Sequence, residues 1–178
     1  MSVQKKGMYE ELLKICVLGS TEFKTSLIRR FAEGKFTTNY LPTLGVDIIT
    51  KQIKVNNNEV NLILVDTIGQ EFFDKLRPSY FRGASAAIIT FEKVDQNSFH
   101  AVRDWYRELK KHHPQAAFPI ALVGFITNSE TIMKGEGMAL AEELGLSYYE
   151  IKPTDKETIE TILHDLVLKV LKCEEENV

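Results

Sequence analysis

The order of the apolar segments is the feature that most constrains the fold of this chain. Short apolar runs of strand length, the first of them over residues 14–19, alternate with amphipathic helical patterns. Residues 99–109 and 159–170 show the apolar spacing of helices. Two of these runs, residues 86–91 and 118–124, are continuously apolar, as expected of strands buried on both faces. This alternation predicts an α/β fold with a mostly parallel sheet between helices. Ligands bind such sheets at the carboxyl ends of the strands, so we expect functional residues in the turns that follow them.

Length and composition predict one globular domain. The 178 residues are 44% hydrophobic and 26% charged, which is typical of a folded domain and excludes a disordered or fibrous chain. The net charge of -3 argues against a basic surface for nucleic acid, so no nucleic-acid partner is expected. The two cysteines, Cys16 and Cys173, form neither a disulfide framework nor a zinc site. We expect a polar tail over residues 1–9, the domain over 10–172 and an acidic tail over 173–178.

The ends of the sequence predict a soluble, cytoplasmic protein. Residues 1–9 contain no apolar stretch of the kind found in signal peptides. No apolar run approaches the roughly 20 residues needed to cross a bilayer. Cys173 lies too far from the last residue for a prenylation motif, and the three glutamates that follow it would repel anionic lipid. We therefore expect no prenyl membrane anchor.

The turn after the first apolar run resembles a phosphate-binding loop. Such loops have the form G-x-x-x-x-G-K-[ST], in which backbone N–H groups and the lysine bind phosphate and the hydroxyl binds Mg²⁺. Gly19, Lys24 and Thr25 fit these roles. However, the loop is one residue shorter than the motif, and Phe23 stands where the second glycine is expected. Taken alone, an ordinary strand–turn–helix explains this segment about equally well.

Two further segments supply residues that suit phosphate chemistry. Asp66 lies at the end of an apolar run, where a carboxylate can hold Mg²⁺ through water. Gly69 can turn its N–H toward a terminal phosphate, and Gln70 can orient an attacking water. Thr43, which precedes the next two extended runs, offers a hydroxyl for Mg²⁺. Residues 48–55 and 60–67 form those runs, and the polar tract Asn56–Asn58 between them predicts a hairpin.

With these segments in view, the sequence resembles the Ras superfamily of small GTPases, and most closely the Rab branch. The resemblance is carried by Y-L-P-T-L-G-V-D (Tyr40–Asp47), V-D-T-I-G-Q-E (Val65–Glu71) and S-Y-F-R-G-A (Ser79–Ala84). It covers nearly the whole chain, from Tyr9 to Lys172. It implies a P-loop NTPase-like three-layer sandwich. The sheet would have six strands, mostly parallel with one antiparallel edge strand, and about five helices would cover it.

The resemblance also implies a role for each candidate residue. GTP or GDP with Mg²⁺ is the implied cofactor. Protein effectors or regulators are implied to bind switch I (Tyr40–Val46) and switch II (Gly69–Phe81). The implied roles are phosphate binding by Gly19, Lys24, Thr25, Tyr40 and Gly69, metal binding by Thr25, Thr43 and Asp66, base contact by Phe36 and Asn128, and placement of the attacking water by Gln70.

This sequence differs from the family in the two motifs that recognise the nucleotide base. The family motif N-K-x-D is replaced by Phe125-Ile126-Thr127-Asn128. An amide such as that of Asn128 offers one acceptor and two donors, whereas a carboxylate accepts from both guanine donors. The family motif S-A-K is also replaced, by a segment in which Pro153 has no backbone N–H to donate. We therefore expect weakened or relaxed base recognition.

Three interpretations follow from this uneven pattern. The first is a divergent GTP- and Mg²⁺-operated switch, whose hydrolysis is slow unless a partner supplies an arginine. The second is a nucleotide-free pseudo-GTPase that acts as a protein-interaction scaffold, in which Phe23 fills the phosphate pocket. Aromatic and apolar side chains of switch II would then bind partners, unless they pack inward as most aromatic side chains do. These side chains are Phe72, Phe73, Leu76, Tyr80 and Phe81. The third is an α/β domain whose motif matches arise by chance.

Overall fold

The fold is seen in a computed structural model, which describes most of the chain. The described residues are 11–19, 24, 27–28, 31, 46–56, 58–67, 77–115, 117–127, 129, 131–152 and 155–175. The strands are β1 (Glu11–Leu18), β2 (Val46–Val55), β3 (Asn58–Thr67), β4 (Ala86–Glu92), β5 (Ile120–Phe125) and β6 (Ser147–Ile151). The helices bounded within these ranges are α2 (Arg77–Phe81), α3 (Gln96–His112), α4 (Lys134–Leu144) and α5 (Lys156–Glu175).

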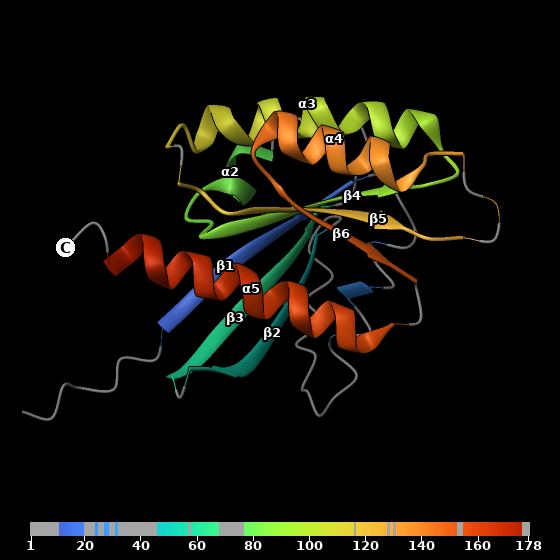
Figure 1. The fold of residues 1–178 in the computed structure, drawn as a ribbon. Helices are drawn as coiled ribbons and strands as arrows, with labels where there is room; N and C mark the ends of the chain where they lie inside the picture. Colours follow the sequence, from blue (N-terminus) through green and yellow to red (C-terminus); the bar gives the residue numbers. More distant parts are fainter. Residues whose placement is uncertain are drawn as a thin grey trace, which may run out of the picture.

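The six strands form one sheet in the order β2-β3-β1-β4-β5-β6 (Figure 1). Strand β1 pairs in parallel with β3 and β4, and β5 pairs in parallel with β4 and β6. Only β2 runs antiparallel, and it lies at one edge beside β3. The predicted sheet, mostly parallel with one antiparallel edge strand, is confirmed.

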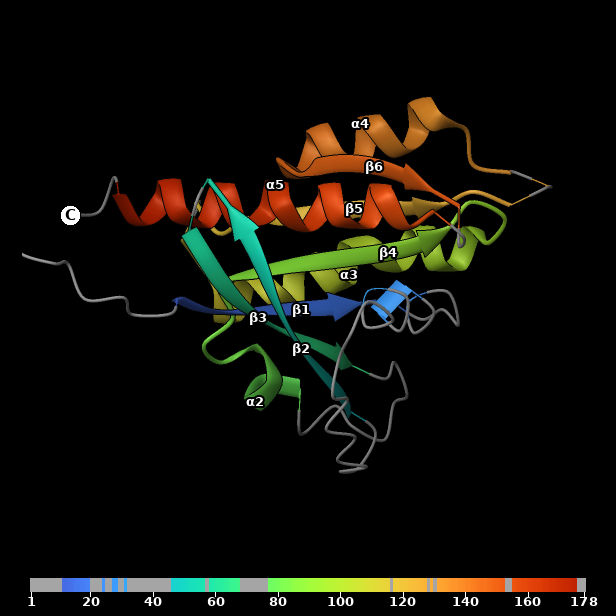
Figure 2. The same cartoon turned by 90° about the horizontal axis from the view of Figure 1, so that it is seen from below.

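Helices cover both faces of this sheet and create two separate cores. Helix α5 lies across one face, and α3 and α4 lie together on the other (Figures 1 and 2). Side chains alternate between the faces along each strand. In β1, Val17 faces the core beneath α5, whereas Cys16 faces the core beneath α3 and α4. Strands β4 and β5 are buried along almost their whole length, as their continuous apolar runs predicted.

The hairpin between β2 and β3 is tighter than the polar tract suggested. Val55 pairs with Asn58, so Asn58 belongs to β3 and not to the turn. Asn56 has a φ of +48°, in the left-handed region that asparagine tolerates better than most residues do. Asn57 lies outside the described residues. The turn chemistry explains why the chain reverses at this point.

Local signals fix the ends of the helices on the α3 side. The Asp95 carboxylate accepts hydrogen bonds from the N–H groups of Asn97 (2.9 Å) and Ser98 (3.2 Å), which starts α3. Helix α4 ends at Gly145, whose φ is +69°. Helix α5 continues to Glu175, into the segment predicted as an acidic tail, and the Cys173 thiol donates to the Ala117 carbonyl at 3.3 Å. Among the described helices, none has both the length and the apolarity needed to cross a membrane.

Candidate functional site

The sheet order brings the carboxyl ends of the parallel strands, and with them Gly19 and Asp66, to one edge of the sheet. The parallel strands β3, β1, β4, β5 and β6 all end at that edge. Residues at the ends of β1 and β3 carry the predicted phosphate functions, and those after β5 and β6 carry the predicted base functions. Strand β4 lies between the two groups. The strands that precede the two groups therefore end on either side of β4, at the edge where open α/β sheets bind ligands.

Lys24 and Asp66 meet at the phosphate end. The Lys24 Nζ lies 2.8 Å from the Asp66 Oδ1, and the two side chains are 3% and 1% exposed. A charged pair so deeply buried persists because each charge compensates the other. An ammonium group that can bind phosphate and a carboxylate that can hold Mg²⁺ thus lie side by side. The structure brings together two residues that the sequence assigned to one site.

Gly19 closes the end of β1 and lies tightly against β4. Its φ is +129°, a backbone conformation that side chains disfavour. A Cβ at this position would lie 2.2 Å from the Thr90 Oγ1. Thr90 itself is buried, and its hydroxyl donates to the Leu18 carbonyl at 2.9 Å. The glycine that the motif requires is therefore also required by packing, and sequence reasoning did not identify Thr90 as its neighbour.

The other predicted site residues lie outside the part of the chain that the structure describes. These residues are Thr25, Phe36, Tyr40, Thr43, Gly69, Gln70 and Asn128. Of the predicted switch II, residues 77–81 are described and form α2. The Tyr80 side chain is half-buried, whereas the Phe81 side chain is fully buried in the core beneath α3 and α4. Phe81 therefore packs inward and offers no apolar surface to a partner.

His113, which follows α3, contacts the carboxyl end of α2. The His113 Nε2 lies 2.8 Å from the Phe81 carbonyl oxygen, and the imidazole stacks on the Phe118 ring at 4.2 Å between centroids. The His113 N–H also donates to the Leu109 carbonyl at the end of α3. This histidine therefore belongs to the packing at the carboxyl end of α3.

The base end is apolar where the family motif is polar. Phe125, at the position of the motif asparagine, is fully buried and belongs to the core beneath α5. The Ile126 N–H donates to the Ile151 carbonyl at 2.8 Å. Neither side chain has a polar group for a base edge. At these two positions the polar side chains of the family motif therefore have no counterpart.

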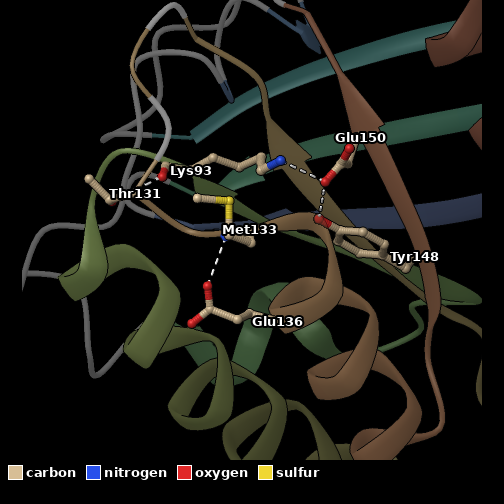
Figure 3. Close-up of polar contacts among 6 residues, drawn as sticks. All are labelled: Lys93, Thr131, Met133, Glu136, Tyr148 and Glu150. Carbon is tan, nitrogen blue, oxygen red and sulfur yellow. Dashed lines mark hydrogen bonds and ion pairs between the residues drawn. The ribbon is translucent and has the colours of Figure 1, made fainter.

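A buried charged cluster lies next to the base end and was not found from the sequence. Lys93 follows β4, is 2% exposed, and its Nζ lies 2.8 Å from the Glu150 Oε1 on β6 (Figure 3). The Tyr148 hydroxyl donates to the same carboxylate oxygen at 2.8 Å. Burial raises the pKa of the Glu150 carboxyl, but the hydrogen bonds from Lys93 and Tyr148 outweigh burial and hold this pKa below its usual value. A lysine after a strand is ordinarily solvated, so no sequence signal marked it.

The described residues fit a phosphate-bound metal better than an independent metal site. Among the residues that the structure describes, no group of three or more His, Cys, Asp or Glu side chains is arranged to hold a metal ion. Asp66 is one carboxylate beside one lysine. This donor set suits Mg²⁺ that is shared with phosphate oxygens, because Mg²⁺ typically takes one or two carboxylates and completes its shell with phosphate and water.

Comparison with known proteins shows similarity to Ras-related proteins over most of the chain. The sequence profile described as "Ras family" matches residues 14–172. Ras-related protein SEC4 of Saccharomyces cerevisiae is 31% identical over 161 residues, which are 89% of this chain and 74% of that protein. Ras-related protein RABA5e of Arabidopsis thaliana is 32% identical over 174 residues, or 96% and 79% of the two chains. Ras-related protein Rab-31 of Rattus norvegicus is 40% identical over 104 residues, or 58% and 53%.

Proposed function

The chain belongs to the Ras family of small GTPases, on its Rab-like branch, and from that membership we propose that it is a divergent nucleotide-operated switch. Members of this family bind GTP or GDP with Mg²⁺ and interact with effectors and regulators. In this chain, we propose, the phosphates and the metal provide most of the binding energy and the base is read only weakly. The buried contact between Lys24 and Asp66 is the observation that carries this proposal.

The charges at the phosphate end determine how it is proposed to bind phosphate and Mg²⁺. Mg²⁺, when bound, would neutralise phosphate charge and orient the phosphates. Lys24 would add a second positive charge against the phosphates, and Asp66 would hold the metal together with the hydroxyls of Thr25 and Thr43. Because Lys24 and Asp66 neutralise each other at 2.8 Å, the ligand must supply an anion to the lysine and a cation to the carboxylate together. Binding is therefore expected to depend strongly on Mg²⁺.

Hydrolysis and signalling are proposed to use the two switches. Gln70 would place the attacking water, and the rate would be slow without an arginine from a partner. Switch I (Tyr40–Val46) and switch II (Gly69–Phe81) would adopt one arrangement with the triphosphate and release it after hydrolysis. Effectors or regulators would bind the arrangement that the triphosphate stabilises.

The proposal of relaxed base choice is supported by the apolar base end. Phe125 is buried in the core, so the asparagine amide of the family motif has no equivalent at that position. Asn128 is the remaining polar candidate for the base. An Asn128→Asp variant should then bind guanine nucleotide more tightly, by about tenfold or more if the carboxylate pairs with a guanine donor that is otherwise unpaired. Unchanged guanine affinity would contradict the assignment of Asn128.

A second candidate function is a nucleotide-free scaffold. It is favoured by the sequence of the phosphate loop, which is one residue shorter than the family motif and has Phe23 in place of the second glycine. The loop that is one residue short and contains Phe23 would then be unable to accept phosphate. In that case the protein would act through binding of partners alone.

Calorimetric titration separates the two functions. The nucleotide-stripped 178-residue chain is titrated with GTP and GDP, with and without Mg²⁺, and with ATP and XTP as base controls. Heat of binding that depends on Mg²⁺, with a dissociation constant of about 1 μM or below, supports the switch, and the ranking of GTP, ATP and XTP reports the base choice. Lys24→Met, verified to be folded under the conditions of the titration, is the variant that should lose binding. A folded wild-type chain without binding at millimolar nucleotide would establish the scaffold instead.

A further inference from the structure

One residue, Lys93, contacts three separate parts of the base end. It follows β4, directly between the phosphate side and the base side of the sheet edge. Its backbone N–H donates to the Phe125 carbonyl at 3.1 Å, at the end of β5. Its backbone carbonyl accepts from the N–H groups of Thr131 and Ile132, both at 2.9 Å, and from the Thr131 hydroxyl at 3.1 Å. Phe125 and Thr131, the residues that flank segment 126–130, are therefore both bonded to the main chain of Lys93.

The side chain of Lys93 adds a contact to a third element. Its ammonium group reaches the Glu150 carboxylate on β6 at 2.8 Å (Figure 3). Strand β5 lies between β4 and β6, so this ion pair spans two strand spacings, about 10 Å. Two long side chains are needed to bridge that distance. The pair therefore ties β4 to β6 across the end of β5.

The packing around β5 explains how the bridge fits. Gly124 pairs with Phe91 on β4 and with Glu150 on β6. A Cβ on Gly124 would lie 2.9 Å from the Phe91 ring and 3.1 Å from the Tyr148 hydroxyl. With no side chain there, Phe91 and Tyr148 close over β5, and the Tyr148 hydroxyl reaches the Glu150 carboxylate. The Glu150 Oε1 thus accepts hydrogen bonds from both Tyr148 and Lys93.

We infer that Lys93 is the positioning residue of segment 126–130 and that it thereby sets how strongly the chain discriminates between nucleotide bases. The segment contains Asn128, the remaining polar candidate for the base. The main-chain hydrogen bonds of Lys93 to Phe125, Thr131 and Ile132 determine the positions of the residues that flank the segment. The ion pair between Lys93 and Glu150 determines where Lys93 lies relative to β6. The part concerning base choice rests on the proposed function, whereas the part concerning position does not.

Hydrogen exchange on the 178-residue chain without added nucleotide tests the positioning role. In Lys93→Met the backbone carbonyl remains but the tie to β6 is lost. The amides of Thr131 and Ile132 should then exchange about tenfold faster or more, because the segment opens locally. Amides of β3, which lies on the far side of β1 from β4, should not change. Lys93→Arg, which can still pair with Glu150, should restore slow exchange.

A matched control removes an ion pair elsewhere on the same face. Arg103 on α3 donates to Glu143 on α4 at 2.7 Å, and both side chains are more than one-third exposed. Arg103→Met should leave exchange at Thr131 and Ile132 unchanged. Lys93→Met exchange rates that match those of wild type at these two amides, or that rise equally throughout the sheet, would overturn the inference. If Lys93→Met does not fold, Lys93→Met/Glu150→Gln avoids an unpaired buried charge, keeps an acceptor for Tyr148, and must show the same local increase.

Titration with GTP, ATP and inorganic tripolyphosphate, each with Mg²⁺, tests the role in base choice. In Lys93→Met the ratio of ATP to GTP dissociation constants should change by about threefold or more, while tripolyphosphate affinity stays as in wild type. An unchanged ratio alongside faster local exchange would overturn the role in base choice and keep the positioning role. If the wild-type chain binds no nucleotide, the proposed switch is wrong and so is the role in base choice, and exchange alone decides the positioning role.

Discussion

At the residue scale, the buried pair of Lys24 and Asp66 is the most consequential feature of the site. Each side chain is almost fully buried, and the two charged atoms are 2.8 Å apart. The net stability of such a pair is small relative to an apolar replacement, but the loss of one partner leaves a buried charge without compensation. The pair therefore makes the site sensitive to single substitutions whether or not a nucleotide binds.

Lys24→Met should destabilise the fold by about 3–5 kcal/mol, because the Asp66 carboxylate stays buried without its cation. Urea unfolding at pH 7 measures this change. Asp66→Asn should have a similar effect through the unpaired lysine, and the double variant Lys24→Met/Asp66→Asn should recover much of the loss. Arg103→Met, which breaks an exposed pair, should cost no more than about 1 kcal/mol. Equal stabilities for Lys24→Met and Arg103→Met would contradict the account of the buried pair.

At the element scale, strand β6 and helix α4 approach each other closely through a glycine. A Cβ on Gly137 would lie 2.3 Å from the Tyr148 hydroxyl oxygen and 2.4 Å from the ring carbon that carries it. Gly135 lies on the same helix, and a Cβ there would meet nothing within 4 Å. Gly137 thus serves packing, while Gly135 only lowers the helix propensity. The two positions form an internal comparison within one helix.

Gly137→Ala should destabilise the protein by about 1–3 kcal/mol, because the added methyl group forces α4 or the Tyr148 ring to move. Gly135→Ala should stabilise it by about 0.5–1 kcal/mol through helix propensity alone. Thermal and urea unfolding of both variants give the two values. A Gly137→Ala protein as stable as Gly135→Ala would show that α4 does not pack on Tyr148 in this way.

At the scale of the whole molecule, contacts between β6 and α5 link stability to pH. The Tyr149 hydroxyl on β6 donates to the Asp165 carboxylate on α5 at 2.8 Å. Burial, reinforced by this hydrogen bond, raises the pKa of Tyr149 from 10.0 to about 12. The folded state therefore keeps the phenolic proton in a pH range where the unfolded chain releases it. This stabilisation is complete below pH 10 and is lost as the pH rises toward 12.

The free energy of unfolding of the wild-type protein should accordingly decrease between pH 10 and about 12. In Tyr149→Phe this decrease should be smaller, because the variant has no phenolic proton at position 149 to release. Unfolding free energies at half-unit pH intervals measure the difference. Burial raises the pKa of the Cys16 thiol to about 11, so Cys16 contributes to the alkaline loss in both proteins and cancels in the comparison. Parallel pH profiles for the two proteins would rule out the role of Tyr149.

Much of the architecture could be predicted from local patterns. Continuous apolar runs predicted β4 and β5, and apolar periodicity predicted α3 and α5. The strand ends differ by a few residues, because pairing carries a strand beyond its apolar run: β1 begins at Glu11, opposite Val60 of β3. Helix α4 was not located from the sequence, since Gly135 and Gly137 weaken its helical pattern. The close packing of α4 on Tyr148 of β6 stabilises the helix despite the low helix propensity of its glycines.

By itself, the sequence determined the alternation of strands and helices, the family, and the residue types at the phosphate end and the base end. These depend on period and on short motifs, which are local properties. The tertiary structure alone decided that Lys24 lies against Asp66 and that Lys93 lies against Glu150. These partners are far apart in the chain, and they meet only because strand order and register bring the strand ends together. A buried charge is tolerated only where an oppositely charged side chain lies next to it. No local sequence pattern specifies which residue that neighbour will be.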